Sequence, residues 1–206
     1  MAVVIFADDA LKNELLTIPF ADDAEITWLE KGATAPATAD AVIDLLAHDN
    51  ASLSGLKINT PLYIVNAVEH TCEHFTLPVV RINGWRSFLG RTSVEAATKI
   101  AGLQEPAEQL FHSLGRTIEW VPDIPGFITA RVVACILNEA FFTLEEKIAT
   151  AEDINQAMKT GTNYPYGPFE WASVIGHEKV YHLLSLLAKE EPRYTPSLLL
   201  NQKALA

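Results

Sequence analysis

The first 122 residues alternate short apolar runs with polar stretches, a pattern typical of strands separated by helices and turns. A helix is predicted at Glu105–Leu114, with Pro106 in its first turn and Gly115 after its end. At roughly 30 residues per βαβ unit, this region has room for about four units of a parallel sheet with flanking helices. The apolar runs, rich in Val, Ile or aromatic residues and predicted as strands, are Val3–Phe6, Glu25–Leu29, Ala41–Leu46, Leu62–Val65, Val79–Ile82 and Thr117–Val121.

A long helix is predicted where this pattern changes, near Asp123. Pro125-Gly126 breaks the chain, and Phe127–Lys147 then runs without Gly or Pro, with apolar residues at helical spacings. The apolar positions cover more than one stripe of the helix, so a single intramolecular neighbour would leave apolar area exposed. We therefore expect a homodimer that forms through residues 123–190.

Three further helices are predicted after the long one. Thr150, followed three residues later by Asp153, resembles a capping box for a helix that runs through Lys159 and stops at Gly161. The other two are predicted at Phe169–Ile175 and His177–Lys189. The chain thus divides into an α/β domain at residues 1–122 and an all-α domain at residues 123–206.

Composition and charge narrow the classes of partner and location. The chain of 206 residues has 15 Lys and Arg against 26 Asp and Glu, a net charge of −11 without any basic stripe, which argues against nucleic acid. No run reaches the roughly 18 apolar residues of a membrane span, and acids stand near the start where a signal peptide would be basic. Cys72 and Cys135 are the only cysteines, which indicates a reducing compartment. These features predict a cytoplasmic protein.

Five short motifs follow one another in the second half of the chain: Asp123-Ile-Pro-Gly-Phe-Ile-Thr-Ala-Arg131, Asn138-Glu-Ala140, Asp153-Ile-Asn-Gln-Ala-Met-Lys-Thr-Gly161, Asn163-Tyr-Pro-Tyr-Gly-Pro-Phe-Glu170 and Arg193-Tyr-Thr-Pro196. Together they resemble the C-terminal domain of the 3-hydroxyacyl-CoA dehydrogenases over residues 123 to about 200. The resemblance implies a preceding Rossmann-like NAD-binding domain, a helical domain that contributes to the active-site cleft and the dimer interface, and NAD-dependent oxidation of a 3-hydroxyacyl-CoA in fatty-acid metabolism.

The dinucleotide-binding loop of that family is missing from the first half. A Gly-x-Gly-x-x-Gly loop normally follows the first strand and lets the pyrophosphate approach a helix N-terminus. Here Asp8 and Asp9 follow the strand, and Gly32 is the first glycine in the chain. The negative charges of Asp8 and Asp9 would repel a pyrophosphate. Glu30 stands at the end of the second predicted strand, where a Rossmann protein holds the ribose, and is the one candidate cofactor contact.

The family's catalytic groups are largely replaced. Counting back from Glu95, which resembles the family's orienting Glu, places Asn83 at the position of the catalytic His, and an amide does not titrate near neutral pH. Ala130 stands at the position of an assisting Asn, and the segment Val65–Val68 lacks the family's Ser. The sequence therefore predicts weak or lost dehydrogenase activity. The alternative is a non-catalytic acyl-CoA-binding or protein-interaction subunit that retains the fold.

Two other groups of side chains leave alternatives open. Trp85, Arg86 and Arg91 lie in or just after the segment Arg81–Leu89. They either line a pocket for an adenine or phosphate, or belong to a strand-end loop packed around an aromatic residue. His70 and His74 would share one face if their segment is helical, as two zinc ligands can, but the spacing does not form His-Glu-x-x-His. We favour a surface or interface segment there and predict no metal site.

Overall fold

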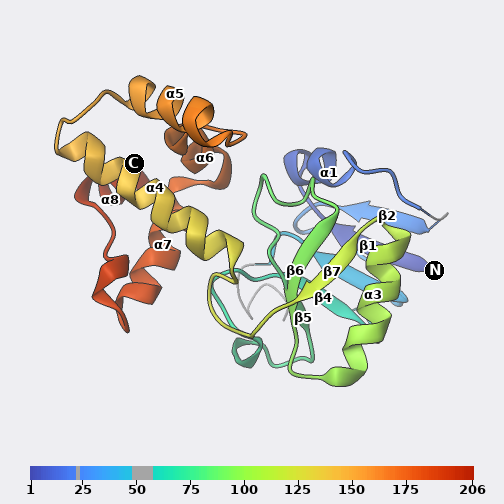
Figure 1. Ribbon diagram of the computed structural model, residues 1–206. Coiled ribbons are helices and arrows are strands. Elements are labelled where there is room, and N and C mark those ends of the chain that lie inside the picture. The colour runs from blue at the N-terminus through green and yellow to red at the C-terminus, as the bar shows by residue number, and fades with distance from the viewer. Residues whose placement is uncertain (22–23, 48–57) are drawn as a thin grey trace. The chain divides into compact units, whose positions relative to one another are not determined.

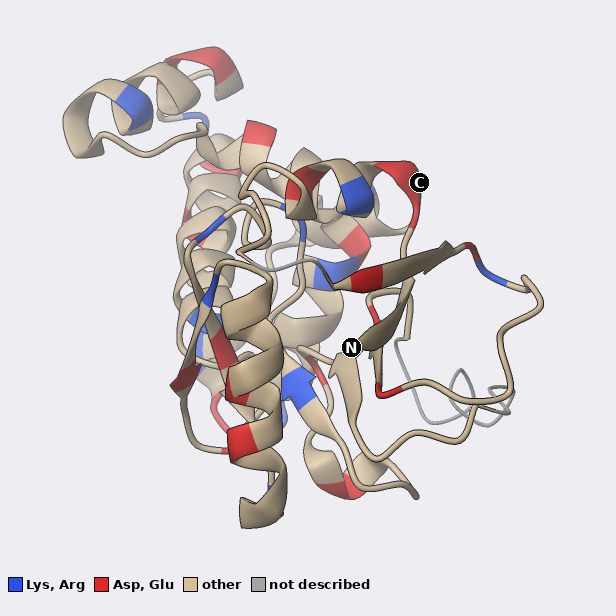
Figure 2. Ribbon diagram, turned by 90° about the vertical axis from the view of Figure 1, so that its right-hand side faces the viewer, with Lys and Arg blue, Asp and Glu red and all other residues tan. Residues whose placement is uncertain are grey.

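The computed structural model describes residues 1–21, 24–47 and 58–206 and divides the chain into two compact units, Met1–Phe127 and Ile128–Ala206 (Figure 1). The first unit is a sheet with flanking helices, and the second consists of helices. In Figure 2, Lys and Arg positions are interspersed with Asp and Glu positions along the ribbon of the described residues.

The first unit is built on a seven-stranded sheet in the order β2-β1-β3-β4-β5-β6-β7. Neighbouring strands are parallel except for β5 and β6, which are antiparallel, so the predicted parallel sheet with flanking helices is confirmed with one antiparallel pair. The β5–β6 connection is short and contains no helix, and antiparallel strands need no crossover. The strands are β1 (Ala2–Phe6), β2 (Glu25–Leu29), β3 (Ala41–Asp44), β4 (Tyr63–Asn66), β5 (Val80–Ile82), β6 (Ser93–Ala97) and β7 (Thr117–Trp120).

Strand burial follows position in the sheet. The central strands β3 and β4 are buried along their whole length, whereas the edge strands β2 and β7 alternate between half-buried and exposed residues. Along β1, Val3 and Ile5 enter one hydrophobic cluster while Val4 and Phe6 enter another. The sheet therefore has an apolar core on both faces, as a Rossmann-like fold requires.

Two α-helices of the first unit cover the face that Val3 and Ile5 occupy. Helix α1 (Asp9–Leu15) joins β1 to β2, and helix α3 (Gln104–Ser113) joins β6 to β7; both bury apolar residues in the same cluster. The strands β4 and β5 are joined by a 3₁₀ turn, η1 (Cys72–His74), without an α-helix. The expectation of about four complete βαβ units is therefore wrong in the described part of the chain.

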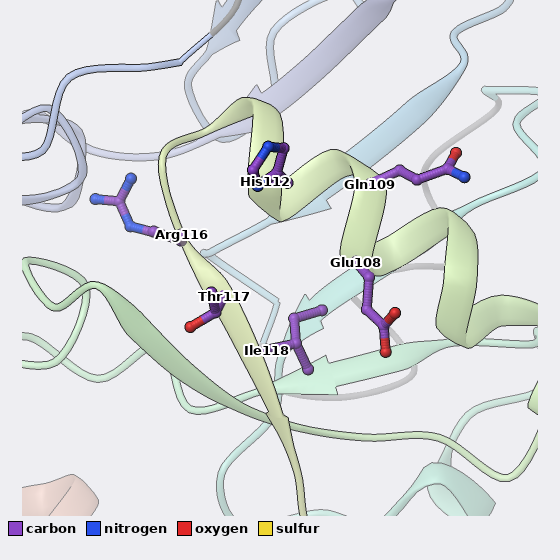
Figure 3. Close-up of a pocket in the computed structure, with 6 residues that line it drawn as sticks. All are labelled: Glu108, Gln109, His112, Arg116, Thr117 and Ile118. Atoms are coloured by element: carbon purple, nitrogen blue, oxygen red, sulfur yellow. The ribbon is translucent and has the colours of Figure 1, made fainter.

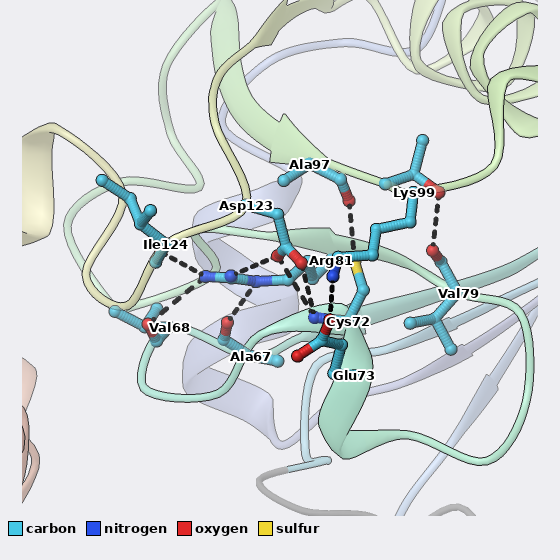
Figure 4. Close-up of polar contacts among 11 residues, drawn as sticks. Ala67, Val68, Cys72, Glu73, Val79, Arg81, Ala97, Lys99, Asp123 and Ile124 are labelled. Carbon is cyan, nitrogen blue, oxygen red and sulfur yellow. Dashed lines mark hydrogen bonds and ion pairs between the residues drawn. The ribbon is translucent and has the colours of Figure 1, made fainter.

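A buried arginine ties the end of the first unit to its sheet (Figure 4). The side chain of Arg81, on β5, is 0% exposed; its Nη1 donates to Asp123 Oδ1 at 2.6 Å, and the guanidinium lies 4.1 Å from the centre of the Phe127 ring. Its Nε donates to the carbonyl of Ala67 at 3.1 Å, and its Nη2 donates to the carbonyl of Ile124 at 3.1 Å. The motif that begins at Asp123 is thereby anchored before the helical unit starts.

Helix α4 is the longest helix of the second unit, and it packs against α6, α7 and α8. Helix α5 begins as predicted, with the Thr150 hydroxyl accepting from the backbone N–H of Asp153 at 3.2 Å, but it runs past Gly161 and ends at Asn163, whose φ is +56°. Helix α8 was not predicted from the sequence. The helices are α4 (Thr129–Glu145), α5 (Ala151–Thr162), α6 (Pro168–Ile175), α7 (His177–Ala188) and α8 (Leu198–Ala204), with a 3₁₀ turn η3 (Pro192–Tyr194).

Among the residues that the structure describes, no helix combines the length and the apolar character needed to cross a bilayer.

The substitution Asp123→Ala is expected to destabilise the first unit by about 3–5 kcal/mol, because it leaves the buried guanidinium of Arg81 without its counter-charge. It also removes the acceptor of the Cys72 backbone N–H, which lies 3.0 Å from Asp123 Oδ2. Urea denaturation monitored by circular dichroism measures the difference. The control is Glu73→Ala, which breaks an exposed ion pair with Lys99 and should leave the midpoint unchanged. Equal midpoints for the two variants would contradict the anchoring role.

Candidate functional site

The N-terminus of α1 is occupied by a carboxylate of the chain itself. Asp8 is the N-cap residue, and its Oδ1 accepts from the backbone N–H of Leu11 at 2.8 Å. Asp9 follows in the first turn, where its exposed carboxylate adds a second negative charge. The partial positive charge at the start of the helix is thus already balanced by these two acids.

Glu30 lies at the same edge of the sheet as Asp8. Phe6 pairs with Leu29 in the parallel register of β1 and β2, and the chain then continues to Asp8 on one strand and to Glu30 on the other. Glu30 is exposed. The structure therefore places the predicted ribose contact and the two acids after β1 at the carboxyl ends of adjacent strands.

These residues do not fit an NAD pyrophosphate. A dinucleotide site presents unpaired backbone N–H groups and glycines to two phosphates. Here the Leu11 N–H is already bonded to Asp8, the neighbouring side chains are acidic, and no glycine precedes Gly32. No catalytic step is therefore derived through this cofactor.

Asp44 is a buried acid that the sequence reasoning missed. It ends β3, directly beside Phe6 of β1, and is 4% exposed. Burial raises its pKa to about 6, although its Oδ1 accepts from the backbone N–H of Leu46 at 2.9 Å and the charge of Lys31 acts in the opposite direction. An acid inside the apolar run Ala41–Leu46 was the available signal, but the run was interpreted only as a strand.

Asn83 and Glu95, the two predicted catalytic positions, lie next to each other. Asn83 Nδ2 donates to Glu95 Oε2 at 3.1 Å, and the backbone N–H of Asn83 donates to the Glu95 carbonyl at 3.0 Å. Asn83 is 4% exposed. Its Oδ1 is buried and has no hydrogen-bond partner within the described ranges. The antiparallel pairing of β5 with β6 brings these two positions together although they are 12 residues apart.

Asn66 fixes the backbone that follows Asn83. Asn66 Nδ2 donates to the Leu45 carbonyl at 3.1 Å, and its Oδ1 accepts from the Gly84 N–H at 3.0 Å. A Cβ atom on Gly84 would lie 2.7 Å from Asn66 Cγ, so only glycine fits there without a shift. The segment Val65–Val68, which lacks the family's Ser, thus supplies a positioning amide at the end of β4.

The loop after Asn83 packs around an aromatic residue. Trp85 is 2% exposed, so of the two alternatives the structure favours the strand-end loop packed around an aromatic residue, because burial leaves no face of the ring for an adenine. Arg91 is exposed, with its guanidinium 4.5 Å from the centre of the Phe88 ring. Arg86 is half-buried, and its Nε is a buried donor without a partner in the described part of the chain.

The segment that carries His70 and His74 is not the α-helix that would place both on one face: His70 lies in a bend, and the 3₁₀ turn η1 begins at Cys72 and ends at His74. The two imidazole rings stack face to face, with centroids 3.9 Å apart and an angle of 6° between their planes. Throughout residues 1–21, 24–47 and 58–206, no three His, Cys, Asp or Glu side chains gather as a metal site.

A shallow pocket of about 430 Å³ lies between α3 and β7 (Figure 3). Arg116 is one of its lining residues, but the guanidinium is committed to backbone carbonyls: Nη2 donates to Leu15 at 2.6 Å and Nη1 donates to Leu114 at 2.7 Å. His112 also lines the pocket, and no acid of the described residues forms an ion pair with it. Arg116 therefore has a structural role, and the side chains that line the pocket show no arrangement suited to a reaction.

In the helical unit, Tyr194 gathers two arginines. Arg131 Nη1 and Arg193 Nη2 both donate to its hydroxyl, at 3.2 and 2.6 Å, and Tyr194 is 4% exposed. Two of the five motifs are thus joined in one cluster. Ala130, at the position of the family's assisting Asn, is fully buried and supplies no polar group.

Comparison with known proteins identifies the second half of the chain. The family model "3-hydroxyacyl-CoA dehydrogenase, C-terminal domain" matches residues 126–206. This unit is thus similar to the C-terminal domain of the 3-hydroxyacyl-CoA dehydrogenases. A 3-hydroxyadipyl-CoA dehydrogenase of Escherichia coli is 42% identical over 93 residues, which are 44% of this chain and 20% of the relative. A probable 3-hydroxybutyryl-CoA dehydrogenase of Deinococcus radiodurans is 31% identical over 65% of this chain and 46% of the relative.

The likeness in fold extends to the first unit. The crystal structure of FadB2 from M. tuberculosis superposes with a TM-score of 0.78 over 98% of this chain and 92% of that chain, at 16% identity. A 3-hydroxybutyryl-CoA dehydrogenase from Escherichia coli has a TM-score of 0.62 and 31% identity, over 69% of this chain and 31% of that chain. The chain spans less than half the length of the two curated relatives named above, and its Rossmann-like unit is shared as a fold.

The free energy of unfolding of the Asp44→Asn variant is expected to increase relative to that of the wild type as the pH rises from about 4 to 7. In the wild type, a folded-state pKa of about 6 above the usual 3.8 means that the folded chain holds this proton more tightly than the unfolded chain, so stability falls as the pH rises between these values. The relative gain approaches about 3 kcal/mol by pH 7. Chemical denaturation at several pH values measures it.

The matched control is Asp40→Asn. Asp40 is exposed and also accepts a backbone N–H, from Ala2 at 2.7 Å, but it bears no burial cost. If the two variants followed the same pH trend, the burial of Asp44 would not be the cause.

Proposed function

We propose that this protein is a 3-hydroxyacyl-CoA dehydrogenase relative of fatty-acid metabolism that binds acyl-CoA esters and has weak or no NAD-dependent dehydrogenase activity. The observation that carries the proposal is the capping of α1 by Asp8, which uses the Leu11 N–H and puts a carboxylate where a Rossmann protein places the pyrophosphate. Similarity of residues 126–206 to the C-terminal domain of the family supports the acyl-CoA ester as ligand class.

The pair of Asn83 and Glu95 supports the loss of proton transfer. A general base must accept a proton near neutral pH, and a carboxamide does not. Loss of a positioned acid or base costs roughly 10²–10⁴-fold in rate. Glu95 orients the amide through the 3.1 Å bond to Nδ2, as a carboxylate would orient an imidazole, so the positioning group is kept while the group it positions has changed.

The experiment combines an activity assay with a binding assay on the full chain. Acetoacetyl-CoA and NADH are expected to give turnover at least 10²-fold below an ordinary dehydrogenase. Acetoacetyl-CoA or butyryl-CoA, without nucleotide, is expected to raise the melting temperature, because a ligand that binds only the folded state stabilises it. Turnover at ordinary rates would overturn the loss of activity, and a lack of stabilisation by any CoA ester would overturn the binding function.

The variant Asn83→His sharpens the activity assay. It restores an imidazole beside Glu95 but leaves Asp8 and Asp9 at the start of α1. We expect the variant to remain inactive with NADH, since the cofactor site stays acidic. Recovery of ordinary turnover by this single substitution would show that only the base was missing.

We further propose a homodimer formed through residues 123–190. Val132 on α4 is 53% exposed and Ile148, just after α4, is 68% exposed, and a symmetric partner would cover such apolar side chains. Light scattering at micromolar concentration should give twice the monomer mass. Val132→Asp should shift the protein toward monomer, whereas Gln156→Asp, an exposed polar position on α5, should not. A monomeric wild type would contradict this proposal.

The two cysteines, Cys72 and Cys135, are free thiols, which supports the expected cytoplasmic location.

A further inference from the structure

Strand β7 is the last strand in the sheet order, so one of its two edges has no partner strand among the described residues. The pocket of about 430 Å³ described above lies next to it, between side chains of α3 and side chains at the start of β7 (Figure 3). We propose that β7 and α3 form a docking groove for an extended, basic segment of another protein, which adds to the sheet as a further strand. This interaction is separate from the proposed binding of acyl-CoA.

The hydrogen bonds between β7 and β6 show which backbone groups of β7 face outward. The backbone N–H of Thr117 donates to the Thr92 carbonyl at 2.8 Å, and the N–H of Val121 donates to a carbonyl of β6 at 2.9 Å. In a parallel pair every second residue bonds to the neighbouring strand, so the N–H and C=O groups of Ile118 and Trp120 point to the open edge. Within the described ranges, no strand or loop bonds to these groups. They can therefore pair with an added strand.

The two faces of β7 offer different surroundings to the side chains of an added strand. Ile118 and Trp120 pack against the apolar cluster that α3 also enters. Thr117 and Glu119 point to the opposite face and are exposed. An added strand would place every second side chain beside Ile118, in the groove next to α3, and the others beside Glu119. A segment that alternates apolar and basic side chains suits this arrangement.

The charges around the groove favour a basic segment. Glu108 on α3 and Glu119 on β7 are exposed, and neither forms an ion pair with a described cation. Glu119 also lies beside Glu95 of β6 in the parallel register, which brings two like charges onto neighbouring strands. Arg116 lines the pocket, but its guanidinium is bonded to backbone carbonyls. A lysine or arginine of the partner would supply the counter-charge.

A second copy of this chain suits the open edge less well. Each copy would bring its own Glu119 to an edge that is already acidic, and each carries a net charge of −11. Natural edge strands are often protected from pairing by Lys or Pro, and Thr117–Trp120 contains neither. The other edge strand differs, because Lys12 lies 5.1 Å from the centre of the Trp28 ring and places a cation beside β2. Strand β7 is therefore the edge that suits a basic partner.

The test uses the full chain and two end-blocked hexapeptides, one that alternates Lys with Val and one that alternates Glu with Val. Hydrogen exchange followed by NMR should show unprotected amides at Ile118 and Trp120 in the free protein, and the Lys peptide should slow their exchange. Fluorescence anisotropy of labelled peptides should give at least about 10-fold weaker binding of the Glu peptide.

Three results of this test would overturn the proposal. The first is protection of both amides in the free protein, which would mean that a second copy or another part of this chain already covers the edge. The second is equal affinity for the Lys and Glu peptides, and the third is a lack of binding by the Lys peptide.

Methylation of the peptide backbone distinguishes strand addition from charge attraction alone. Only alternate amides of an added strand face β7, so N-methyl groups on the odd residues and on the even residues should have different effects. One of the two methylated Lys peptides should lose at least about 10-fold in affinity, and the other should keep most of it. Equal affinities of the two methylated peptides would contradict strand addition.

Charge reversal locates the site on β7. The variant Glu119→Lys should bind the Lys peptide roughly 5-fold more weakly at low ionic strength, because an exposed attraction is lost. The matched control is Glu25→Lys, which reverses an exposed acid on the other edge strand, β2, and should keep the wild-type affinity. An unchanged affinity in Glu119→Lys, or an equal loss in both variants, would overturn the assignment to β7.

Discussion

The guanidinium of Arg81 connects several parts of the first unit at a single buried point. It bonds to the loop after β4, to Asp123 and to Ile124, and it lies against Phe127, while Asp123 also holds the start of the turn η1 (Figure 4). A charge with no exposed surface is tolerable only when its donors are all satisfied. The backbone carbonyls of these loops must therefore stay where they are, and the ends of β4 and β5, which carry Asn66 and Asn83, are held with them.

At the carboxyl edge of the sheet, the fold keeps its geometry but lacks the groups that suit a pyrophosphate. Open α/β sheets bind ligands where the strand order reverses, and here β1 lies between β2 and β3 at that point. The side chains at the ends of these three strands include Asp8, Glu30 and Asp44. Acids at all three ends are suited to an amine, a cation or no ligand, and unsuited to a pyrophosphate. The ends of β4 and β5 are followed by the amides of Asn66 and Asn83 instead, and Glu95 of β6 accepts a hydrogen bond from the second of them.

The strands of the sheet could be predicted because their apolar runs are long enough to identify without tertiary information. Strand β6 was missed as a strand because Ser93-Val-Glu-Ala-Ala97 contains mostly small residues, whose burial comes from packing between β5 and β7 and not from their own hydrophobicity. The end of α5 was misplaced because Gly161 stays helical and Asn163 adopts the left-handed conformation. In both cases, tertiary context overrides the conformational preference of the local sequence.

Residues of the candidate site that follow from motif spacing could be found in the sequence, whereas residues whose role depends on burial could not. Counting from Glu95 located Asn83, and the pairing of β5 with β6 makes that count a real contact. Trp85 looked like a ligand contact because aromatic residues serve both cores and sites, and only burial distinguishes the two. Arg81 stood in a run interpreted as a strand, so its bond to the distant carbonyl of Ile124 was not visible in the sequence. Asp44 also stood in such a run, and the burial that raises its pKa was not visible there.

The capping of α1 by Asp8 has a consequence for how this chain is maintained in a cell. In a nucleotide-binding Rossmann domain the first helix gains a partner for its leading amides only when the cofactor arrives, so the amount of folded protein responds to cofactor supply. Here the side chain of Asp8, one residue before the helix begins, is that partner. Under the proposed loss of nucleotide binding, the folding equilibrium of this chain does not depend on the concentration of the cofactor.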